Sequence, residues 1–422
     1  MIMAQEMKDS GVKWLGMIPK DWKIKRGKYN FEKHKFIPGS RSEQYDRLAL
    51  TMKGVIHRSK DDVDGLQPKD FATYQLLRKD ELVFKLIDLQ NISTSRVGLS
   101  PYTGLVSPAY IVIRAIDEII PKFAEKYYLM LWYRNIFNIL GDDGIRSNLS
   151  AVDLLNVPVC YPAKNEQEVI ADFLDKKCAE IDGLLADLEA EVKTLAEYKK
   201  SIIAETVTRG LNPNAPMKQS GIPWAETIPA HWTTAKGKYL FVLRRTKGNP
   251  HNLELMSPTQ KFGVIPQSQV EGVVLVKEKT DLNTFRTIRP GDFCISLRSF
   301  QGGFEYSQYE GVVSPAYQVF YPIKPIADGY FKYMFKSDGF ISYINTFSMS
   351  LRDGKNIAFE DFGNSYIPTP PIEEQEAIAA YLNKKCAMID QSTADKQTQI
   401  ETLKSYKSSL IYEYVTGKKQ VI

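Results

Sequence analysis

The sequence predicts an α+β protein in which two mixed α/β globules lie in tandem. Two long helices separate them and form an antiparallel coiled coil, which gives the chain pseudo-twofold symmetry. Three observations support this prediction. Blocks of sequence recur about 208 residues apart, short β-rich runs are broken by Gly, Pro and Asn, and apolar residues recur every seven positions in one long segment of each half. The length of 422 residues agrees, because a typical domain has roughly 100–200.

The duplication is visible in three blocks whose spacing barely changes. DSGVKWLGMIPKDWKIKRGKYNF at 9–31 corresponds to QSGIPWAETIPAHWTTAKGKYLF at 219–241, an offset of 210. GLVSPAY at 104–110 returns as GVVSPAY at 311–317, and NEQEVIADFLDKKCAEID at 165–182 returns as EEQEAIAAYLNKKCAMID at 373–390, with offsets of 207 and 208. This constancy predicts two copies of one unit. The expected domains are a first globule, a first helix, a second globule and a second helix, at residues 1–162, 163–212, 213–372 and 373–422.

Each predicted globule contains short β-rich runs with turn residues between them. The runs are LVF at 82–84, YIVIR at 110–114, GVVLV at 272–276, FCISL at 293–297 and YQVFY at 317–321. An apolar segment that suits a helix lies inside each globule, at 123–140 and at 329–347. The pattern is typical of a mixed α/β globule and leaves the strand order open.

The last part of each copy predicts a long helix. No Pro occurs between Pro162 and Pro213, and apolar residues repeat every seven positions, which is typical of coiled-coil packing. Lys396 interrupts this repeat in the second copy. Neither helix has a partner within its own copy, and Pro213 and Pro216 lead straight into the second globule, so we expect the helices to pack against each other in opposite directions. The expected seam consists of Leu174, Ile181, Leu188, Leu195, Ile202, Leu382, Ile389, Leu403 and Leu410.

Composition excludes several classes of protein. With 43% hydrophobic and 25% charged residues, the chain has the composition of ordinary globular domains. No stretch approaches the roughly 18–20 apolar residues that span a bilayer, and the start MIMAQEMKDSGVKW lacks the apolar core of a signal peptide. Four cysteines in so long a chain argue for a reducing compartment. We therefore expect a cytoplasmic protein with no membrane partner.

No catalytic or metal-binding pattern is visible. The sequence has no GxxxxGK[ST] phosphate loop and no GxGxxG after a strand, and its four histidines are scattered without an HExxH or a CxxC. The Asn/Asp-Pro-Pro-aromatic tetrapeptide of amino-methylating enzymes is also missing. The sequence thus predicts no catalytic residue, no metal ligand and no cofactor bound by this chain.

The net charge of +5 is unevenly distributed, with +5, −4, +4 and 0 on the four predicted domains in chain order. Two positive globules suit phosphate contacts at two places along one nucleic acid, although lysines that serve only solubility explain the charge equally well. The polar loops favour the nucleic acid, because Arg with Asn or Gln can read base edges while Lys and Ser hold phosphates. The DNA-binding candidates of the first globule are Arg58, Lys60, Gln90, Asn91, Ser93, Arg96, Arg146 and Asn148. Those of the second globule are Arg244, Arg245, Lys247, Asn249, Gln267, Gln269, Arg298, Gln301, Arg352 and Lys355.

These motifs together resemble a known family. SGVKWLGMIPKDW near the start, the two SPAY turns and the two Glu-Gln helix openings followed by KKCAxID are similar to the specificity subunit of type I restriction-modification systems. The resemblance covers essentially the whole chain. It implies a non-catalytic subunit with two target-recognition domains, each of which reads one half of a bipartite, non-palindromic site in double-stranded DNA.

The same resemblance implies the partners. The helices would set the spacer between the half-sites and dock two methyltransferase (modification) subunits, and restriction subunits with translocase activity would join the complex. S-adenosylmethionine, ATP and Mg would belong to those partners, which act in DNA methylation and host defence in a prokaryotic cytoplasm. The weaker second helix, with Lys396 in its seam, departs from an ideal pair.

Two other functions stay open at this point. A scaffold that gathers protein partners without reading DNA would explain the repeat and the helices, but not two basic globules with divergent polar loops. An enzyme that acts alone would need a catalytic motif, and the sequence shows none. Salt-dependent DNA binding by the purified complex separates a DNA reader from a scaffold.

Overall fold

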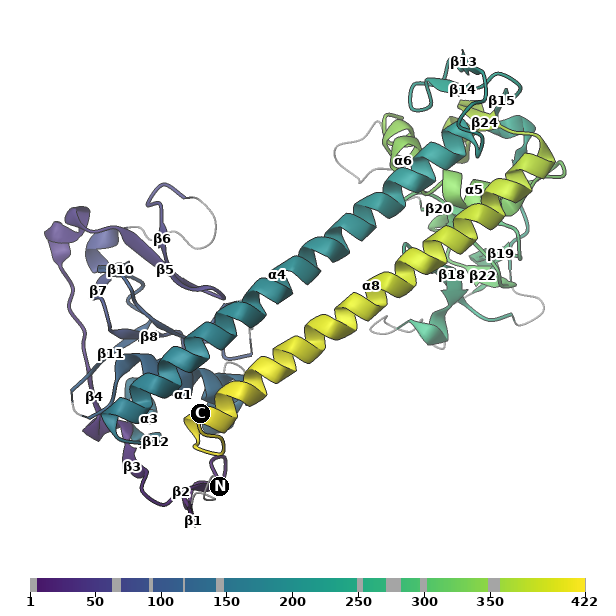
Figure 1. Cartoon of the computed structure of the whole chain (residues 1–422). Coiled ribbons are helices and arrows are strands. Elements are labelled where there is room, and N and C mark those ends of the chain that lie inside the picture. The colour runs from purple at the N-terminus through teal and green to yellow at the C-terminus, as the bar shows by residue number, and fades with distance from the viewer. Residues whose placement is uncertain are drawn as a thin grey trace. The chain divides into compact units, whose positions relative to one another are not determined.

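Two structural units make up the computed structural model of the chain. The structure describes residues 6–62, 70–90, 94–116, 118–141, 148–248, 253–270, 282–296, 302–347 and 357–421. Unit 1 consists of Met1–Glu189 with Thr398–Ile422, and unit 2 consists of Ala190–Gln397. The unit boundaries fall inside the two long helices rather than at the ends of the predicted globules, because each unit combines one globule with the parts of both helices that pack on it (Figure 1).

Unit 1 contains two four-stranded sheets. One has the order β6 (Gly54–Arg58), β5 (Arg47–Thr51), β10 (Gly104–Val106), β7 (Gln75–Leu77), and the other has β4 (Phe31–Lys33), β11 (Ile111–Ala115), β8 (Leu82–Phe84), β9 (Val97–Leu99). The pairs β1 (Met7–Asp9) with β2 (Met17–Pro19) and β3 (Lys23–Arg26) with β12 (Pro158–Tyr161) complete the strands. The helices of the globule are α1 (Pro121–Tyr133), α2 (Ile136–Leu140) and α3 (Ala151–Asn156).

Unit 2 repeats one of the two four-stranded sheets of unit 1 and has two-stranded pairs in place of the other. Its four-stranded sheet, β16 (Phe241–Leu243), β23 (Tyr317–Pro322), β20 (Phe293–Ser296), β21 (Glu305–Tyr306), has the same order as the β4-β11-β8-β9 sheet. The other pairs are β13 (Met217–Gln219) with β14 (Thr227–Pro229), β15 (Thr233–Lys236) with β24 (Tyr366–Thr369), β17 (Met256–Thr259) with β18 (Gly263–Pro266), and β19 (Arg286–Ile288) with β22 (Gly311–Val313). Its short helices are α5 (Asp328–Met334), α6 (Asp338–Asn345) and α7 (Phe359–Asn364).

The predicted α+β class is confirmed, and the β-rich runs coincide with strands. LVF at 82–84 is β8, and the runs at 110–114, 293–297 and 317–321 match β11, β20 and β23 within a residue or two. The run at 272–276 lies outside the described residues. The predicted helix at 123–140 is two helices, because Asn135 adopts a left-handed φ of 60° between α1 and α2, a conformation that Asn tolerates better than most residues.

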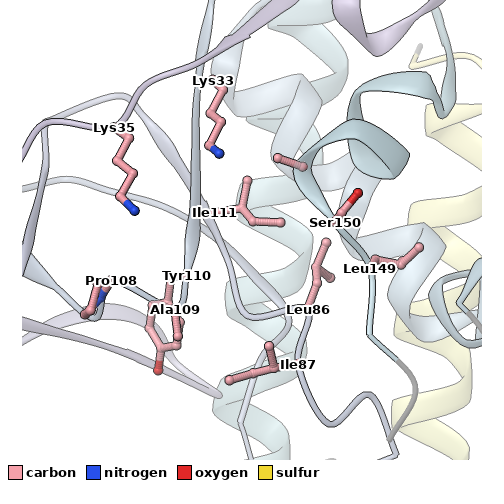
Figure 2. A pocket seen from close by; sticks show the side chains of 11 residues that line it. Lys33, Lys35, Leu86, Ile87, Pro108, Ala109, Tyr110, Ile111, Leu149 and Ser150 are labelled. Atoms are coloured by element: carbon pink, nitrogen blue, oxygen red, sulfur yellow. The ribbon is translucent and has the colours of Figure 1, made fainter. Parts of the chain in front are cut away.

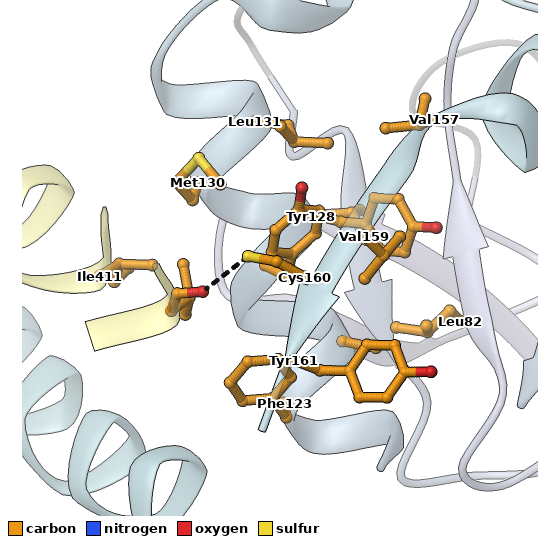
Figure 3. Packing of buried hydrophobic residues seen from close by; sticks show 14 of the residues in the cluster. Leu82, Phe123, Tyr128, Met130, Leu131, Val157, Val159, Cys160, Tyr161 and Ile411 are labelled. Carbon is orange, nitrogen blue, oxygen red and sulfur yellow. Dashed lines mark hydrogen bonds between the residues drawn. The ribbon is translucent and has the colours of Figure 1, made fainter. Parts of the chain in front are cut away.

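The core of unit 1 lies between the β4-β11-β8-β9 sheet, α1 and the long helices. Trp22, Tyr127 and Tyr128 are among its largest fully buried side chains. The last turns of the chain take part, since the Cys160 thiol donates a hydrogen bond to the Val415 carbonyl at 3.6 Å (Figure 3). Burial raises the pKa of Cys160 to about 12, so this cysteine serves packing rather than reactivity.

The long helices are α4 (Lys164–Arg209) and α8 (Ile372–Val415) (Figure 1). In unit 1, Phe173 stacks on Tyr414 with ring centroids 4.6 Å apart, and the Lys407 ammonium lies 2.6 Å from the Asp182 carboxylate. In unit 2, Lys199 pairs with Asp390 at 2.6 Å. In unit 1 the residue numbers of the contacts increase along α4 while those of their partners decrease along α8. The two helices therefore run in opposite directions there.

The predicted seam residues are buried to different degrees. Leu174, Ile181 and Ile202 on α4 and Leu382, Ile389 and Leu410 on α8 are buried, whereas Leu188, Leu195 and Leu403 are half-buried. Lys396, the residue that interrupts the repeat, forms an ion pair with Glu191 across the helices of unit 2. None of the described helices, α4 and α8 included, contains a stretch long and apolar enough to cross a membrane.

Candidate nucleic-acid interface and helix anchors

Each globule is fastened to the start of a long helix by a repeated tryptophan. The Trp22 indole N–H donates to Glu166 at 3.3 Å, and the Trp232 indole N–H donates to Glu374 at 2.9 Å. Both tryptophans are fully buried, so the carboxylate satisfies an N–H that water cannot reach. Burial raises the pKa of Glu166, and the hydrogen bond from Trp22 opposes that shift.

The glutamine that follows each of these glutamates holds the backbone of its own globule. Buried Gln167 accepts from the Ile120 N–H at 2.8 Å and donates to the carbonyls of Glu118 and Pro162 at 3.0 and 2.9 Å. Gln375 repeats this arrangement, accepting from the Ala327 N–H at 3.0 Å and donating to the Pro370 carbonyl at 2.8 Å. A side-chain amide suits the position because it both donates and accepts. The repeated Glu-Gln motif is therefore a structural anchor.

A second contact between globule and helix differs between the units. In unit 1 the Lys126 ammonium on α1 lies 2.6 Å from Asp175 on α4 and 3.1 Å from Glu125. Burial by itself lowers the pKa of Lys126, but the two carboxylates raise it above its usual value. In unit 2 the equivalent positions are Tyr333 and Asn383, and the Tyr333 hydroxyl donates to the Asn383 side chain at 2.9 Å. Sequence reasoning missed both pairs, although their offsets of 207 and 208 match those of the repeat.

A buried contact between a basic side chain and a carboxylate follows the edge strand in both units. The His34 Nδ1 lies 2.5 Å from Glu81 in unit 1, and Arg244 donates two hydrogen bonds to Asp292, at 2.6 and 2.7 Å, in unit 2. Each carboxylate side chain is only 3% exposed. The Asp292 carboxylate raises the pKa of Arg244, whose guanidinium also lies 4.4 Å from the Tyr321 ring centroid. The guanidinium of Arg244, a predicted DNA contact, is therefore occupied by a partner within unit 2.

The other described candidates of unit 2 are more available. Arg245 and Lys247 are exposed, and their side chains form no hydrogen bond or ion pair with other described residues. Gln267 and Gln269 lie on a 3-10 turn at Gln267–Gln269, where Gln269 is exposed and Gln267 is half-buried. These four side chains lie where a nucleic acid could reach them.

The candidates of unit 1 have more internal partners. Arg58 pairs with Asp62 at 2.7 Å, and Lys60 donates to the Ser42 and Glu43 carbonyls at 3.1 and 3.4 Å. Asn148 accepts a hydrogen bond from the Asp88 N–H at 3.0 Å, and Gln90 is exposed.

Arg96 lies in a different place from the one predicted. Its side chain is fully buried, and its guanidinium donates to the carbonyls of Lys85, Ile87 and Asp88 at 3.4, 3.4 and 2.6 Å. Burial lowers the pKa of Arg96, against the effect of the Asp88 carboxylate. A guanidinium that donates to three carbonyls fixes the course of the chain after β8. The prediction that Arg96 contacts DNA does not fit this placement.

The remaining candidates lie outside the described residues. They are Asn91, Ser93, Arg146, Asn249, Arg298, Gln301, Arg352 and Lys355. Within the described ranges, no three or more His, Cys, Asp or Glu side chains come together in a way that could hold a metal ion.

Known proteins resemble this chain in sequence and in fold. Residues 233–402 match the family model described as the type I restriction modification DNA specificity domain. The chain is 22% identical, over 96% of both chains, to a protein of Methanocaldococcus jannaschii named as the type I restriction enzyme MjaX specificity subunit. It is 28% identical to the type I restriction enzyme StySPI specificity subunit of Salmonella potsdam over 44% of this chain and 41% of that one.

The fold is also similar to that of a solved chain. That chain comes from a structural study of complex assembly and conformational transition of the type I R-M system. The two folds agree with a TM-score of 0.68 at 14% identity, over 95% of this chain and 99% of the other. Both units and both long helices therefore fall within a fold that has been observed before.

Proposed function

We infer that this chain is a member of the family of type I restriction-modification specificity subunits and serves as the DNA sequence-recognition subunit of such a complex. The observation that carries the inference is the agreement of the family match with the similarity along 96% of a named specificity subunit. A specificity subunit is not catalytic by itself. Methylation of adenine, with S-adenosylmethionine, and cleavage, with ATP and Mg, would be the work of partner subunits.

We further propose that each unit reads one half of a bipartite site. The two units share a sheet order and the Trp-Glu and Gln anchors, but their exposed polar side chains differ. Equivalent frames with different surfaces suit one asymmetric, non-palindromic target. The paired helices would form the antiparallel coiled coil that sets the spacer between the half-sites.

The duplicated frame also suits two identical partners. Two methyltransferase subunits would dock on the chain, one for each copy of the repeat, because a pseudo-twofold arrangement offers two similar surfaces. Restriction subunits would join this core. No specific observation favours the scaffold alternative. It also does not explain the exposed cations Arg245 and Lys247, which have no ion-pair partners among the described residues.

Methylome sequencing tests the spacer role of the helices. We predict that four residues inserted after Leu188, about one helical turn or ~6 Å, lengthen the spacer by one or two base pairs and leave both half-sites unchanged. The same four residues inserted after Gln420, beyond the end of α8, serve as the control and should leave the methylated site as it was. Altered half-sites with an unaltered spacer would refute the role of the helices as a ruler.

A further inference from the structure

A pocket of about 200 Å³ opens beside the edge strand β4 in unit 1. Lys33 and Lys35 line one side of it, and the SPAY turn, through Tyr110, lines another (Figure 2). Leu86 and Leu149 contribute apolar surface. Alternate residues of an extended strand point to the same side, about 7 Å apart, so both lysines can serve one ligand. Figure 2 shows both ammonium groups pointing in the same direction.

No described carboxylate forms an ion pair with the two lysines of this pocket. Lys33 and Lys35 are exposed, and neither forms an ion pair or side-chain hydrogen bond with another described residue. The neighbouring carboxylate Glu32 forms an ion pair with Arg114, and Glu81 lies 2.5 Å from His34. Glu32 and Glu81 therefore have other partners, and Asp153 accepts hydrogen bonds from the N–H and the hydroxyl of Ser150 at 2.9 and 2.6 Å.

Other cations act on residues near the pocket, although one of them, Arg58, is itself paired with Asp62. Burial lowers the pKa of Lys85 at the end of β8, the charge of Arg96 lowers it further, and the charge of Asp88 opposes both. On the other side, the charges of Arg96, Arg47 and Arg58 act on the Tyr110 hydroxyl, whose pKa is nevertheless raised by burial. An anion in this pocket would meet the positive charges of Lys33 and Lys35 directly.

We propose that Lys33 and Lys35 bind the phosphate backbone of DNA at this pocket. The proposal rests on the function proposed above and extends it to residues outside the polar loops. Ammonium groups only donate hydrogen bonds and act as point charges, so they suit phosphate oxygens better than the mixed donors and acceptors of base edges. The apolar surface excludes part of the water and strengthens each charge contact.

The equivalent positions in unit 2 predict an unequal contribution from the two units. The repeat aligns Lys33 and Lys35 with Leu243 and Arg245, because the N–H of the residue between them donates to the Val112 carbonyl in unit 1 and to the Val319 carbonyl in unit 2. Arg245 is exposed and has no side-chain partner among the described residues. Unit 1 thus offers two backbone-binding cations at this position, and unit 2 offers one.

The salt dependence of DNA binding tests the proposal. The full chain would be purified with the methyltransferase subunits of its own system, and its affinity measured from about 50 to 200 mM salt on a duplex that carries the methylated site and on a scrambled duplex. Each phosphate contact contributes about 0.9 to the slope of log affinity against log salt. We expect Lys33→Ala with Lys35→Ala to reduce the slope by about 2, and Arg245→Ala by about 1. Wild type should therefore lose about tenfold more affinity over this range than the double variant.

Matched variants keep the outcome interpretable. Lys33→Arg with Lys35→Arg should retain the slope, and Lys13→Ala with Lys28→Ala, which removes two exposed lysines elsewhere in unit 1, should also retain it. An unchanged slope in the Lys33/Lys35 alanine variant, while wild type binds its site specifically, would overturn the proposal. A loss restricted to one DNA sequence would also overturn it, because it would make these lysines base contacts. Wild type that fails to bind DNA would instead overturn the proposed function.

Discussion

Unit 1 fastens its globule to α4 through an ion pair, whereas unit 2 fastens its globule to α8 through a neutral hydrogen bond at the equivalent positions. Lys126 and Asp175 make the first contact, and Tyr333 and Asn383 make the second. The Trp-Glu and Gln anchors beside them are the same in both units. We call this contact between the globule and its long helix the joint. The joint occupies equivalent positions in the two units but is ionic in unit 1 and neutral in unit 2, so the two joints should respond differently to salt and to pH.

A second difference lies inside the equivalent sheets. Glu305 on β21 occupies the position that Gly98 has on β9, since they pair with the equivalent residues Cys294 and Val83. The Glu305 side chain is 10% exposed and its Oε1 pairs with Lys336 at 2.5 Å. At Gly98 an added Cβ would lie 2.7 Å from the Leu50 side chain, so unit 1 has no room for a similar group. Unit 2 therefore carries a buried acid that unit 1 cannot hold.

The largest expected effect comes from breaking the ion pair of unit 1. Lys126→Met keeps the apolar stem but leaves Glu125, 18% exposed, and Asp175, 42% exposed, without their cation. Because water screens the more exposed Asp175, we expect a loss at the lower end of the range for buried pairs, about 3 kcal/mol from the free energy of unfolding of unit 1. Tyr333→Phe in unit 2 removes one neutral hydrogen bond and should cost about 1 kcal/mol. Hydrogen exchange with peptide resolution measures the two units separately.

Transplanting the pair of unit 2 provides the control for that comparison. Lys126→Tyr with Asp175→Asn should recover part of the stability that Lys126→Met loses, and added salt should weaken wild-type unit 1 more than this double variant. Equal costs for Lys126→Met and Tyr333→Phe at low salt would show that the two joints are energetically equivalent despite their chemistry.

The second prediction uses pH to separate the units. Burial raises the pKa of Glu305 to about 7, and Lys336 only partly opposes this shift. The folded unit binds the Glu305 proton more tightly than the unfolded chain does, so protonation of Glu305 stabilises folded unit 2. This stabilisation is complete below the ordinary pKa of about 4.5 and is lost as the pH rises through about 7. The change amounts to at most about 3 kcal/mol. Glu305→Gln should flatten the pH dependence of unit 2 in denaturant unfolding followed by hydrogen exchange.

Unit 1 supplies the reference for this measurement, since Gly98 cannot titrate at the equivalent position. The peptides of unit 1 should keep their own pH dependence in the Glu305→Gln variant. If unit 2 loses the same stability between pH 5 and 8 with Gln as with Glu, another group controls its response.

Much of the fold could be predicted because repeats and periodicity are properties of the local sequence. The strands at 82–84 and 317–321 and the two long helices needed only that information. The order of the strands could not be predicted, because it depends on pairings such as Leu105 with Arg47, far apart in the chain. The joint of Lys126 with Asp175 escaped for the same reason, since 49 residues separate them.

The candidate interface was harder to predict than the fold. Arg96 ends the polar segment QNISTSR and is of a residue type that often contacts base edges. Its side chain is nevertheless buried and donates to three carbonyls. In the sequence Arg244 has the appearance of an exposed cation, but in the fold its guanidinium donates to the Asp292 carboxylate. Lys33 and Lys35 lie outside the polar loops, and only their place in the pocket beside the SPAY turn distinguishes them from other exposed lysines. Burial and long-range partners, rather than residue type, decide which cations are available.

The smallest expected effect concerns the asymmetry of the helix seam. The repeat places Lys396 where the first copy has Leu188, and its side chain, 27% exposed, pairs with Glu191, which is 54% exposed. Such a partly exposed ion pair contributes at most about 1 kcal/mol, whereas a partly buried Leu gains somewhat more from burial. Lys396→Leu should therefore stabilise unit 2 by about 1 kcal/mol in thermal unfolding, and Glu191→Ala should destabilise wild type but not this variant. A destabilised Lys396→Leu would mean that the ion pair holds the helices together more firmly than the apolar contact that the first copy uses.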